Sequence, residues 1–151
     1  MNKITPFLWF DDQAEEAMRF YVSIFKNSKA LSVQPGPNGK AMSVTFELEG
    51  QAFMALNGGP LFKFTEAISL FVSCATQEEV DDLWAKLTAD GGAESRCGWL
   101  KDKYGLSWQI IPTALMELLG DKDPKKAGRA MEAMLTMNKI DIKGLQEARD
   151  R

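Results

Sequence analysis

The chain contains the same succession of patterns twice. FLWFDDQAEEAMRFY, at residues 7–21, aligns with LFVSCATQEEVDDLW, at residues 70–84, when Glu15 is set against Glu78, a shift of 63 residues. Near the end of each half, GQAFMALN from Gly50 aligns with GLSWQIIP from Gly105, a shift of 55 residues. An internal repeat on this scale predicts two copies of one supersecondary unit, and this restricts the fold more than any single element does.

Apolar spacing predicts one helix and four strands in the first half, and one helix and three strands in the second. The first half is predicted to contain strand 4–10, helix 14–25 and strands 31–34, 43–48 and 52–57. The second half is predicted to contain strand 68–74, a helix from Thr76 to about Asp90, and strands 93–100 and 106–111. Beyond Pro112 the pattern predicts three helices, at 113–119, 124–137 and 140–149. Because the second half aligns with the first, we interpret both halves as having the order βαβββ.

Local signals place the starts of the two repeated helices. Asp11 or Asp12 is predicted to cap the first helix, because short acidic side chains accept hydrogen bonds from free helical N–H groups. Thr76 followed by Glu79 predicts a capping box at the second.

The predicted fold class is α+β, with tandem βαβββ modules and C-terminal helices. We expect a single domain, residues 1–151, made of modules at about 1–60 and 65–112 plus helices at 113–151. Each sheet has one face to bury, so the two modules should pack together. Clefts at such junctions commonly bind ligands, so we expect a small-molecule ligand in the cleft between the modules.

The composition excludes several kinds of site. The chain has 151 residues, a formal net charge of −3 and no histidine. The absence of histidine excludes a Ser-His-Asp triad, a Cys-His pair and a histidine-ligated metal. The net negative charge argues against a nucleic-acid partner.

No apolar run approaches the roughly 20 residues of a membrane-spanning helix, and the N-terminal residues do not resemble a secretory signal. We therefore expect a cytoplasmic protein without a membrane partner. Cys74 and Cys97 are expected to be free, structural thiols in that compartment.

The stretch CGWLKDKYGLSWQIIP, residues 97–112, predicts a hairpin rich in aromatic side chains. By strand alternation Trp108 lies on the opposite face from Gln109, and Trp108 is expected to pack under a helix. Gln109 has two interpretations: a strand amide bonded to backbone or water, or a pocket amide that orients a ligand. Trp9 and Trp99 could likewise face a cleft or the core. Glu47 is the one strand acid whose side chain could face inward.

Three segments resemble the PhnB-like branch of the glyoxalase/bleomycin resistance/dioxygenase, or vicinal oxygen chelate, superfamily. They are NGGP at residues 57–60, TQEEVDDLW at 76–84 and CGWLKDKYGLSWQIIP. Members of this branch are often labelled 3-demethylubiquinone-9 3-methyltransferase-like. The resemblance extends from about Ile4 through the C-terminal helices. It implies the tandem βαβββ fold and favours a homodimer. Four apolar residues in the C-terminal region are candidates for the dimer contact: Met131, Met134, Leu135 and Met137.

In metal-using relatives, the resemblance implies ligands on the first and last strand of each module. The last-strand ligand is commonly a Glu after a D-x-x-G turn, and here Gln109 follows the turn at 102–105. Its counterpart in the first half is Met54, and Leu61 stands where related sequences often have His. Such neutral groups are poor ligands for hard cations, so no metal and no cofactor are predicted.

The sequence thus favours a PhnB-like, metal-free, small-molecule binding protein, and whether it is an enzyme is left open. The alternatives are a metal-dependent lyase, isomerase or dioxygenase and, with less support, 3-demethylubiquinone-9 3-methyltransferase. Methyl transfer from adenosylmethionine usually needs a Gly-rich strand-to-helix turn, and no strand is followed by one. No catalytic residue is assigned. The predicted ligand-binding residues are Gln109, Trp9, Asn57, Phe62, Trp99 and Glu47.

Overall fold

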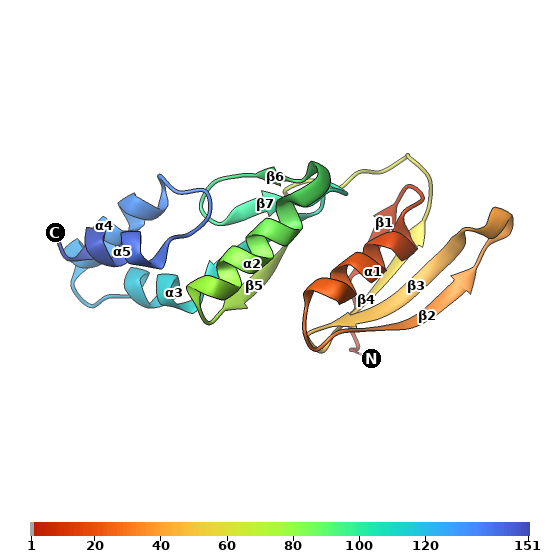
Figure 1. Cartoon of the computed structure of the whole chain (residues 1–151), viewed down its shortest axis with the longest axis horizontal. Coiled ribbons are helices and arrows are strands. Elements are labelled where there is room, and N and C mark those ends of the chain that lie inside the picture. Colours follow the sequence, from red (N-terminus) through yellow and green to blue (C-terminus); the bar gives the residue numbers. More distant parts are fainter. Residues whose placement is uncertain (1) are drawn as a thin grey trace. The chain divides into compact units, whose positions relative to one another are not determined.

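The computed structural model describes residues 2–151 and forms two compact units, Met1–Phe64 and Thr65–Arg151 (Figure 1). The second unit contains the predicted module 65–112 together with the C-terminal helices. The single-domain organisation and the cleft between modules stay predictions.

The first unit has the predicted order βαβββ. Its elements are β1 (Phe7–Phe10), α1 (Ala14–Ile24), β2 (Lys29–Pro35), β3 (Ala41–Leu48) and β4 (Gln51–Asn57). The sheet order is β1-β4-β3-β2, with β1 parallel to β4 and the other pairs antiparallel. Glu49 and Gly50 form the turn between β3 and β4, and both residues have positive φ angles, of 48° and 82°.

The second unit repeats this order and then continues into helices. Its elements are β5 (Ser69–Cys74), α2 (Gln77–Thr88), β6 (Ala93–Glu94), β7 (Trp99–Lys101), β8 (Ser107–Pro112), α3 (Thr113–Leu119), α4 (Pro124–Met134) and α5 (Ile142–Arg149). The sheet order, β5-β8-β7-β6, matches that of the first unit. The α+β fold with tandem βαβββ modules and C-terminal helices is therefore confirmed. None of the helices within residues 2–151 is long and apolar enough to cross a membrane.

One face of the first sheet is buried beneath α1 (Figure 1). The buried α1 residues recur at helical spacing: Ala14, Ala17, Met18, Tyr21 and Ile24. Alternate strand residues complete this core, including Leu8, Val44, Phe46, Phe53 and Ala55. Because strand side chains alternate, Phe7, Trp9 and Met54 lie on the opposite, more exposed face.

The predicted cap of α1 by Asp11 or Asp12 is wrong. The helix has no side-chain cap from its N-cap residue, Gln13. Instead, Asn57 Oδ1 at the end of β4 accepts a hydrogen bond from Ala14 N at 2.8 Å. By contrast, Thr76 caps α2 as predicted, accepting from Glu79 N at 3.2 Å. The Glu79 carboxylate accepts in turn from the N–H of Ala75.

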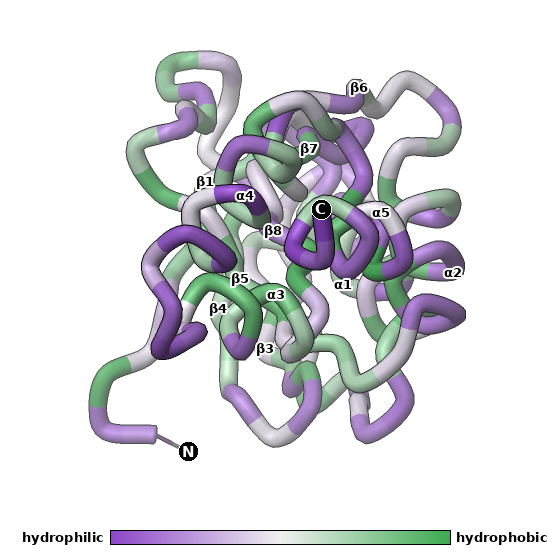
Figure 2. The backbone as a smooth tube through the Cα atoms, turned by 90° about the vertical axis from the view of Figure 1, so that its left-hand side faces the viewer, coloured by the Kyte–Doolittle hydropathy of each residue, from purple (hydrophilic) through white to green (hydrophobic). Residues whose placement is uncertain are grey.

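In the second unit, α2 packs on one face of the sheet, and its tube alternates between hydrophilic and hydrophobic colours (Figure 2). Trp84 and Leu87 of α2, and Trp108 and Ile110 of β8, are buried in this core. A separate cluster joins β8 to the C-terminal helices, formed by Ile111, Leu115, Leu118, Ala130, Ile140 and Leu145. Gln77 of α2 connects this cluster to the core between α2 and the sheet.

Gln77 makes two backbone hydrogen bonds to the C-terminal segment. Its Nε2 donates to Ile140 O at 2.9 Å, and its Oε1 accepts from Ile142 N at 2.8 Å. The helices themselves are shorter than predicted, since α4 ends at Met134 and α5 begins at Ile142. Met134 and Met137 pack on the C-terminal cluster, while Met131 and Leu135 are exposed. The homodimer stays a prediction.

The predicted strand 93–100 is wrong as a single strand. It is divided into β6 and β7 by a turn, in which Cys97 and Gly98 have φ angles of 60° and 86°. The N–H groups of these two residues donate to Met137 O and Asn138 O, both at 2.8 Å. The C-terminal segment therefore holds the turn that ends β6.

The aligned register of the first strands is wrong by one residue. Phe7 pairs with Met54 in the first sheet, and Phe71 pairs with Gln109 in the second. Phe71, rather than Leu70, is thus the counterpart of Phe7. The cause is a connection between strand and helix that is one residue shorter in the second unit, at residues 75–76 against 11–13. A shift of one residue moves every strand side chain to the other face.

Candidate functional site

Two predicted ligand residues, Trp99 and Gln109, share one face of the second sheet with Phe71, which was not predicted. Trp99 on β7 and Phe71 on β5 are both register partners of Gln109 on β8. Phe71 is 52% exposed, and Trp99 and Gln109 are partly exposed. We call this surface, made by Phe71, Trp99, Gln109 and Ser69, the amide face.

The Gln109 side chain is fixed in orientation. Its Nε2 donates to Ser69 Oγ at 2.9 Å, across the parallel pair of strands. Among the residues that the structure describes, none donates a hydrogen bond to its Oε1. An amide whose nitrogen is held by a neighbour presents its carbonyl oxygen as an oriented acceptor.

Trp108 points the opposite way, as predicted, and is 2% exposed. Its Nε1 donates to Asp102 Oδ2 at 2.9 Å. Asp102 is buried too, and its Oδ1 accepts from Tyr104 N and Leu106 N at 2.9 and 3.1 Å. The Asp102 carboxylate thus links the D-x-x-G turn to the buried Trp108 by hydrogen bonds. The sequence analysis did not predict this role of Asp102.

Four of the proposed ligand residues lie in the first unit. Trp9 Nε1 donates to Gly59 O at 3.0 Å, and the Phe62 ring lies edge-on to Trp9 with centroids 4.9 Å apart. Asn57 uses both ends of its amide internally, since Nδ2 also donates to Ala41 O at 2.8 Å. Glu47 lies 3.8 Å from Lys29 Nζ. The structure therefore brings Trp9 and Phe62 together, whereas Asn57 and Glu47 have other partners.

The groups at the positions where the resemblance implies metal ligands do not fit a hard divalent cation. Gln109 is bonded to a serine, Met54 offers a thioether, and Leu61 is a 74% exposed hydrocarbon. Such cations need several carboxylate or carbonyl oxygens converging on one point. Within residues 2–151 no three His, Cys, Asp or Glu side chains gather as a metal site would require.

Both cysteines are free thiols. Burial, together with the nearby Glu79 carboxylate, raises the pKa of Cys74 to about 12. Because this pKa is far above neutral pH, the Cys74 sulfur is protonated and unsuited to nucleophilic attack. Cys97 is partly exposed in the turn that follows β6.

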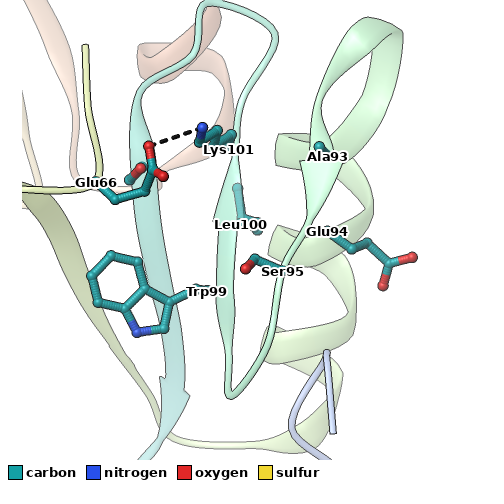
Figure 3. A pocket seen from close by; sticks show the side chains of 8 residues that line it. Glu66, Ala93, Glu94, Ser95, Trp99, Leu100 and Lys101 are labelled. Atoms are coloured by element: carbon teal, nitrogen blue, oxygen red, sulfur yellow. Dashed lines mark ion pairs between the residues drawn. The ribbon is translucent and has the colours of Figure 1, made fainter.

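A cavity of about 250 Å³ lies beside the amide face, within the second unit (Figure 3). It is lined by Glu66, Ala93, Glu94, Ser95, Trp99, Leu100, Lys101 and Ser107. Of these residues, the sequence analysis selected only Trp99. Strand alternation could have added Lys101 and Ser107, which share a face with Trp99 and Gln109. Nothing in the sequence marks Glu66, which reaches the site from the segment before β5.

Comparison with solved structures shows the class of protein. The PhnB protein of Bacillus cereus is 40% identical, with a TM-score of 0.69, over 74% of this chain and 99% of that chain. A Pseudomonas aeruginosa protein is 20% identical, with a TM-score of 0.61, over 74% of this chain and 98% of its own. The fosfomycin resistance protein FosX of Listeria monocytogenes, complexed with Mn(II) and sulfate, is 16% identical, with a TM-score of 0.51, over 71% and 88%.

The repeated βαβββ units and these likenesses show that the chain has the fold of glyoxalase/bleomycin resistance proteins. The family model described as 3-demethylubiquinone-9 3-methyltransferase matches residues 2–111, so the chain belongs to that PhnB-like family. The matched region ends before α3, and the likeness therefore does not extend through the C-terminal helices as the motifs suggested. A comparison with curated proteins finds no match.

Proposed function

We propose that this PhnB-like protein binds a small organic molecule without a metal, on the amide face of its second sheet. The observation that carries the proposal is the Gln109 amide, held by Ser69 between Trp99 and Phe71. Ligand sites commonly combine aromatic walls with a few oriented polar groups. This face has both.

The chemistry of the face favours a flat, partly apolar ligand that carries a hydrogen-bond donor. Trp99 and Phe71 would contribute contact with a ring, since aromatic side chains pack well against planar groups. Gln109 Oε1 would accept a hydrogen bond from the ligand. The neutral side chains around Gln109 support binding rather than metal-assisted turnover.

Methyl transfer is the second candidate, and the description of the family model is what favours it. Against it, the connections from strand to helix, residues 11–13 and 75–76, contain no glycine. A phosphate- or nucleotide-binding turn usually requires glycine, because the backbone must approach the ligand closely. We therefore rank methyl transfer below binding.

The test is a fragment screen by ¹H–¹⁵N NMR on the untagged full chain, after its metal content has been measured. We expect flat fragments with an N–H donor to shift the Gln109 side-chain and Trp99 indole signals. Gln109→Leu should weaken their binding about threefold to tenfold, the range expected for one hydrogen bond. Gln34→Leu is a matched control, because Gln34 is an exposed strand glutamine of the first unit.

Two results would contradict the proposal. One is a stoichiometric divalent metal, among Zn, Ni, Mn, Co and Fe(II), that raises the melting temperature. The other is fragment binding that Gln109→Leu and Gln34→Leu weaken equally. Binding of adenosylmethionine in the same screen would favour methyl transfer instead.

A further inference from the structure

The cavity beside the amide face contains an ion pair at its mouth. Lys101 Nζ lies 2.9 Å from Glu66 Oε1, and their side chains are 44% and 63% exposed (Figure 3). The hydrogen bond from Lys101 holds the pKa of Glu66 below its ordinary value. Glu94 extends away from this pair, and its Oε1 accepts from Trp84 Nε1 at 2.9 Å. Lys101 is therefore paired with Glu66 and not with Glu94, the other acidic residue that lines the cavity.

Ser107 supplies the second observation. It is 1% exposed and lines the cavity, and within the part of the chain that is described its Oγ has no hydrogen-bond partner. A buried hydroxyl without a partner destabilises the folded protein, and native proteins retain few of them. A polar ligand atom in the cavity would give Ser107 its missing partner.

Register brings these groups together. Ser107 on β8 and Lys101 on β7 are directly paired, so their side chains stand next to each other on one face, with Cβ atoms about 5 Å apart. Trp99, two residues before Lys101, lies on the same face and forms a wall of the cavity. A hydroxyl, an ammonium and an indole ring thus border one space.

We propose that this cavity binds a small planar carboxylate, whose anionic group displaces Glu66 from Lys101 and accepts a hydrogen bond from Ser107 Oγ. The ring of the ligand would lie against Trp99. This deepens the proposed function and rests on it for the binding face, but it depends on different polar residues. Glu66 is an internal model for the ligand, because it already places a carboxylate on Lys101.

Displacement of Glu66 is energetically accessible. Exposed ion pairs contribute little to stability, because water screens them and both side chains lose conformational freedom. Glu66 also comes from a segment outside any strand or helix, so it can move without breaking the sheet. A phosphate group fits less well, since Lys101 is the only basic residue among those that line the cavity within the described chain.

The test compares two probes of the same shape, 2-naphthoate and 2-naphthamide, on the full chain. The readout is the indole N–H signal of Trp99, assigned with Trp99→Phe. We expect naphthoate to bind about tenfold more tightly than the neutral amide, as charge-assisted hydrogen bonds do. Glu66→Gln should tighten naphthoate binding by up to about fivefold, because it removes the competing carboxylate.

Two substitutions test the contacts themselves. Lys101→Met should abolish the preference for naphthoate, whereas Lys86→Met, which breaks the exposed pair with Asp82 on α2, should not. Ser107→Ala should weaken naphthoate binding about threefold to tenfold. It should leave the melting temperature unchanged or higher, because it removes the unpaired hydroxyl. A fall in both binding and melting temperature would point to a structural role and overturn the assignment of Ser107.

The outcomes separate this inference from the proposed function. If naphthoate binds no more tightly than naphthamide, and Lys101→Met and Glu66→Gln have no effect, the carboxylate site is overturned. The amide face remains supported in that case if Gln109→Leu weakens the binding of naphthamide, whose N–H can donate to Gln109 Oε1. A naphthoate preference that requires Lys101 but is insensitive to Gln109→Leu supports the carboxylate site, since naphthoate has no donor for Gln109 Oε1. If the N–H fragments are equally insensitive to Gln109→Leu, the role of Gln109 is contradicted while the carboxylate site remains. No shift of Trp99 with either probe overturns the carboxylate site.

Discussion

The two sheets share one strand order but differ in the edge strand that follows the helix, β2 in the first unit and β6 in the second. In the first unit β2 has seven residues and pairs with β3 at six positions. In the second unit β6 has two residues and pairs with β7 at two positions. The two units therefore share the order of neighbouring strands, while the length of the edge strand, β2 or β6, differs between them. The cavity with Ser107 lies beside the shortened strand.

The hairpin turns of the two units also differ in length. Glu49–Gly50 joins β3 to β4 with two residues on the surface of the first unit. The corresponding turn of the second unit is longer, and the buried Asp102 holds it. A turn that binds the core by a buried carboxylate should be far more sensitive to substitution than a surface turn.

The largest effect is expected from Asp102→Ala. The change leaves Trp108 Nε1 and the N–H groups of Tyr104 and Leu106 without their acceptor, so the free energy of unfolding should fall by about 3–5 kcal/mol. Glu49→Ala, at the other turn, should change it by less than about 1 kcal/mol. Urea denaturation measures both. Equal losses would show that the carboxylate does not distinguish the two turns.

Gly98→Ala should have the next largest effect. Gly98 has a φ of 86°, and a Cβ there would lie 2.6 Å from Ile111 Cδ1 and 3.1 Å from Ile110 O. Gly105 has the same φ with nothing within 4 Å of such a Cβ. Backbone strain of about 1–2 kcal/mol applies to both, and overpacking adds about 1–3 kcal/mol at Gly98 alone.

The difference in stability between Gly98→Ala and Gly105→Ala therefore measures the cost of overpacking at Gly98, in the turn between β6 and β7. Thermal and urea unfolding of Gly98→Ala and Gly105→Ala provide the difference. Equal stabilities of the two variants would mean that the turn can shift to accommodate the added methyl group with no loss of free energy. Its hydrogen bonds to the C-terminal segment would then not restrain it.

Periodicity predicted the elements because each signal lies within a few residues. The 3.6-residue spacing located α1 and α2, and alternation placed Trp108 and Gln109 on opposite faces. The predicted strand 93–100 failed because its interruption depends on carbonyls of Met137 and Asn138, some 40 residues later. The repeat alignment failed by one residue, since alignment follows residue types and not the length of one short connection.

The site was only partly predictable for a similar reason. Gln109 and Trp99 were selected from the hairpin, and alternation could have added Lys101, which lies on the same face as Trp99. Glu66 could not be found, because an acidic residue in a loop has no periodic signal and its partner lies in β7. The unpaired state of Ser107 is likewise a property of packing, which no sequence pattern records.

The helix starts provide the smallest and most closely matched comparison. The α2 cap is local, between Thr76 and Glu79, whereas Asn57 caps α1 from the end of β4. Thr76→Ala should lower the free energy of unfolding by about 1 kcal/mol, the usual value of an N-cap. Asn57→Ala should cost about 2 kcal/mol, because it removes two partly buried hydrogen bonds.

Asn57→Asp separates the two bonds. It keeps an acceptor for Ala14 N but loses the donor to Ala41 O, so its stability should lie between the wild type and Asn57→Ala. Urea unfolding of the three variants tests this order. If Thr76→Ala proves as costly as Asn57→Ala, the remote cap adds nothing beyond a local one.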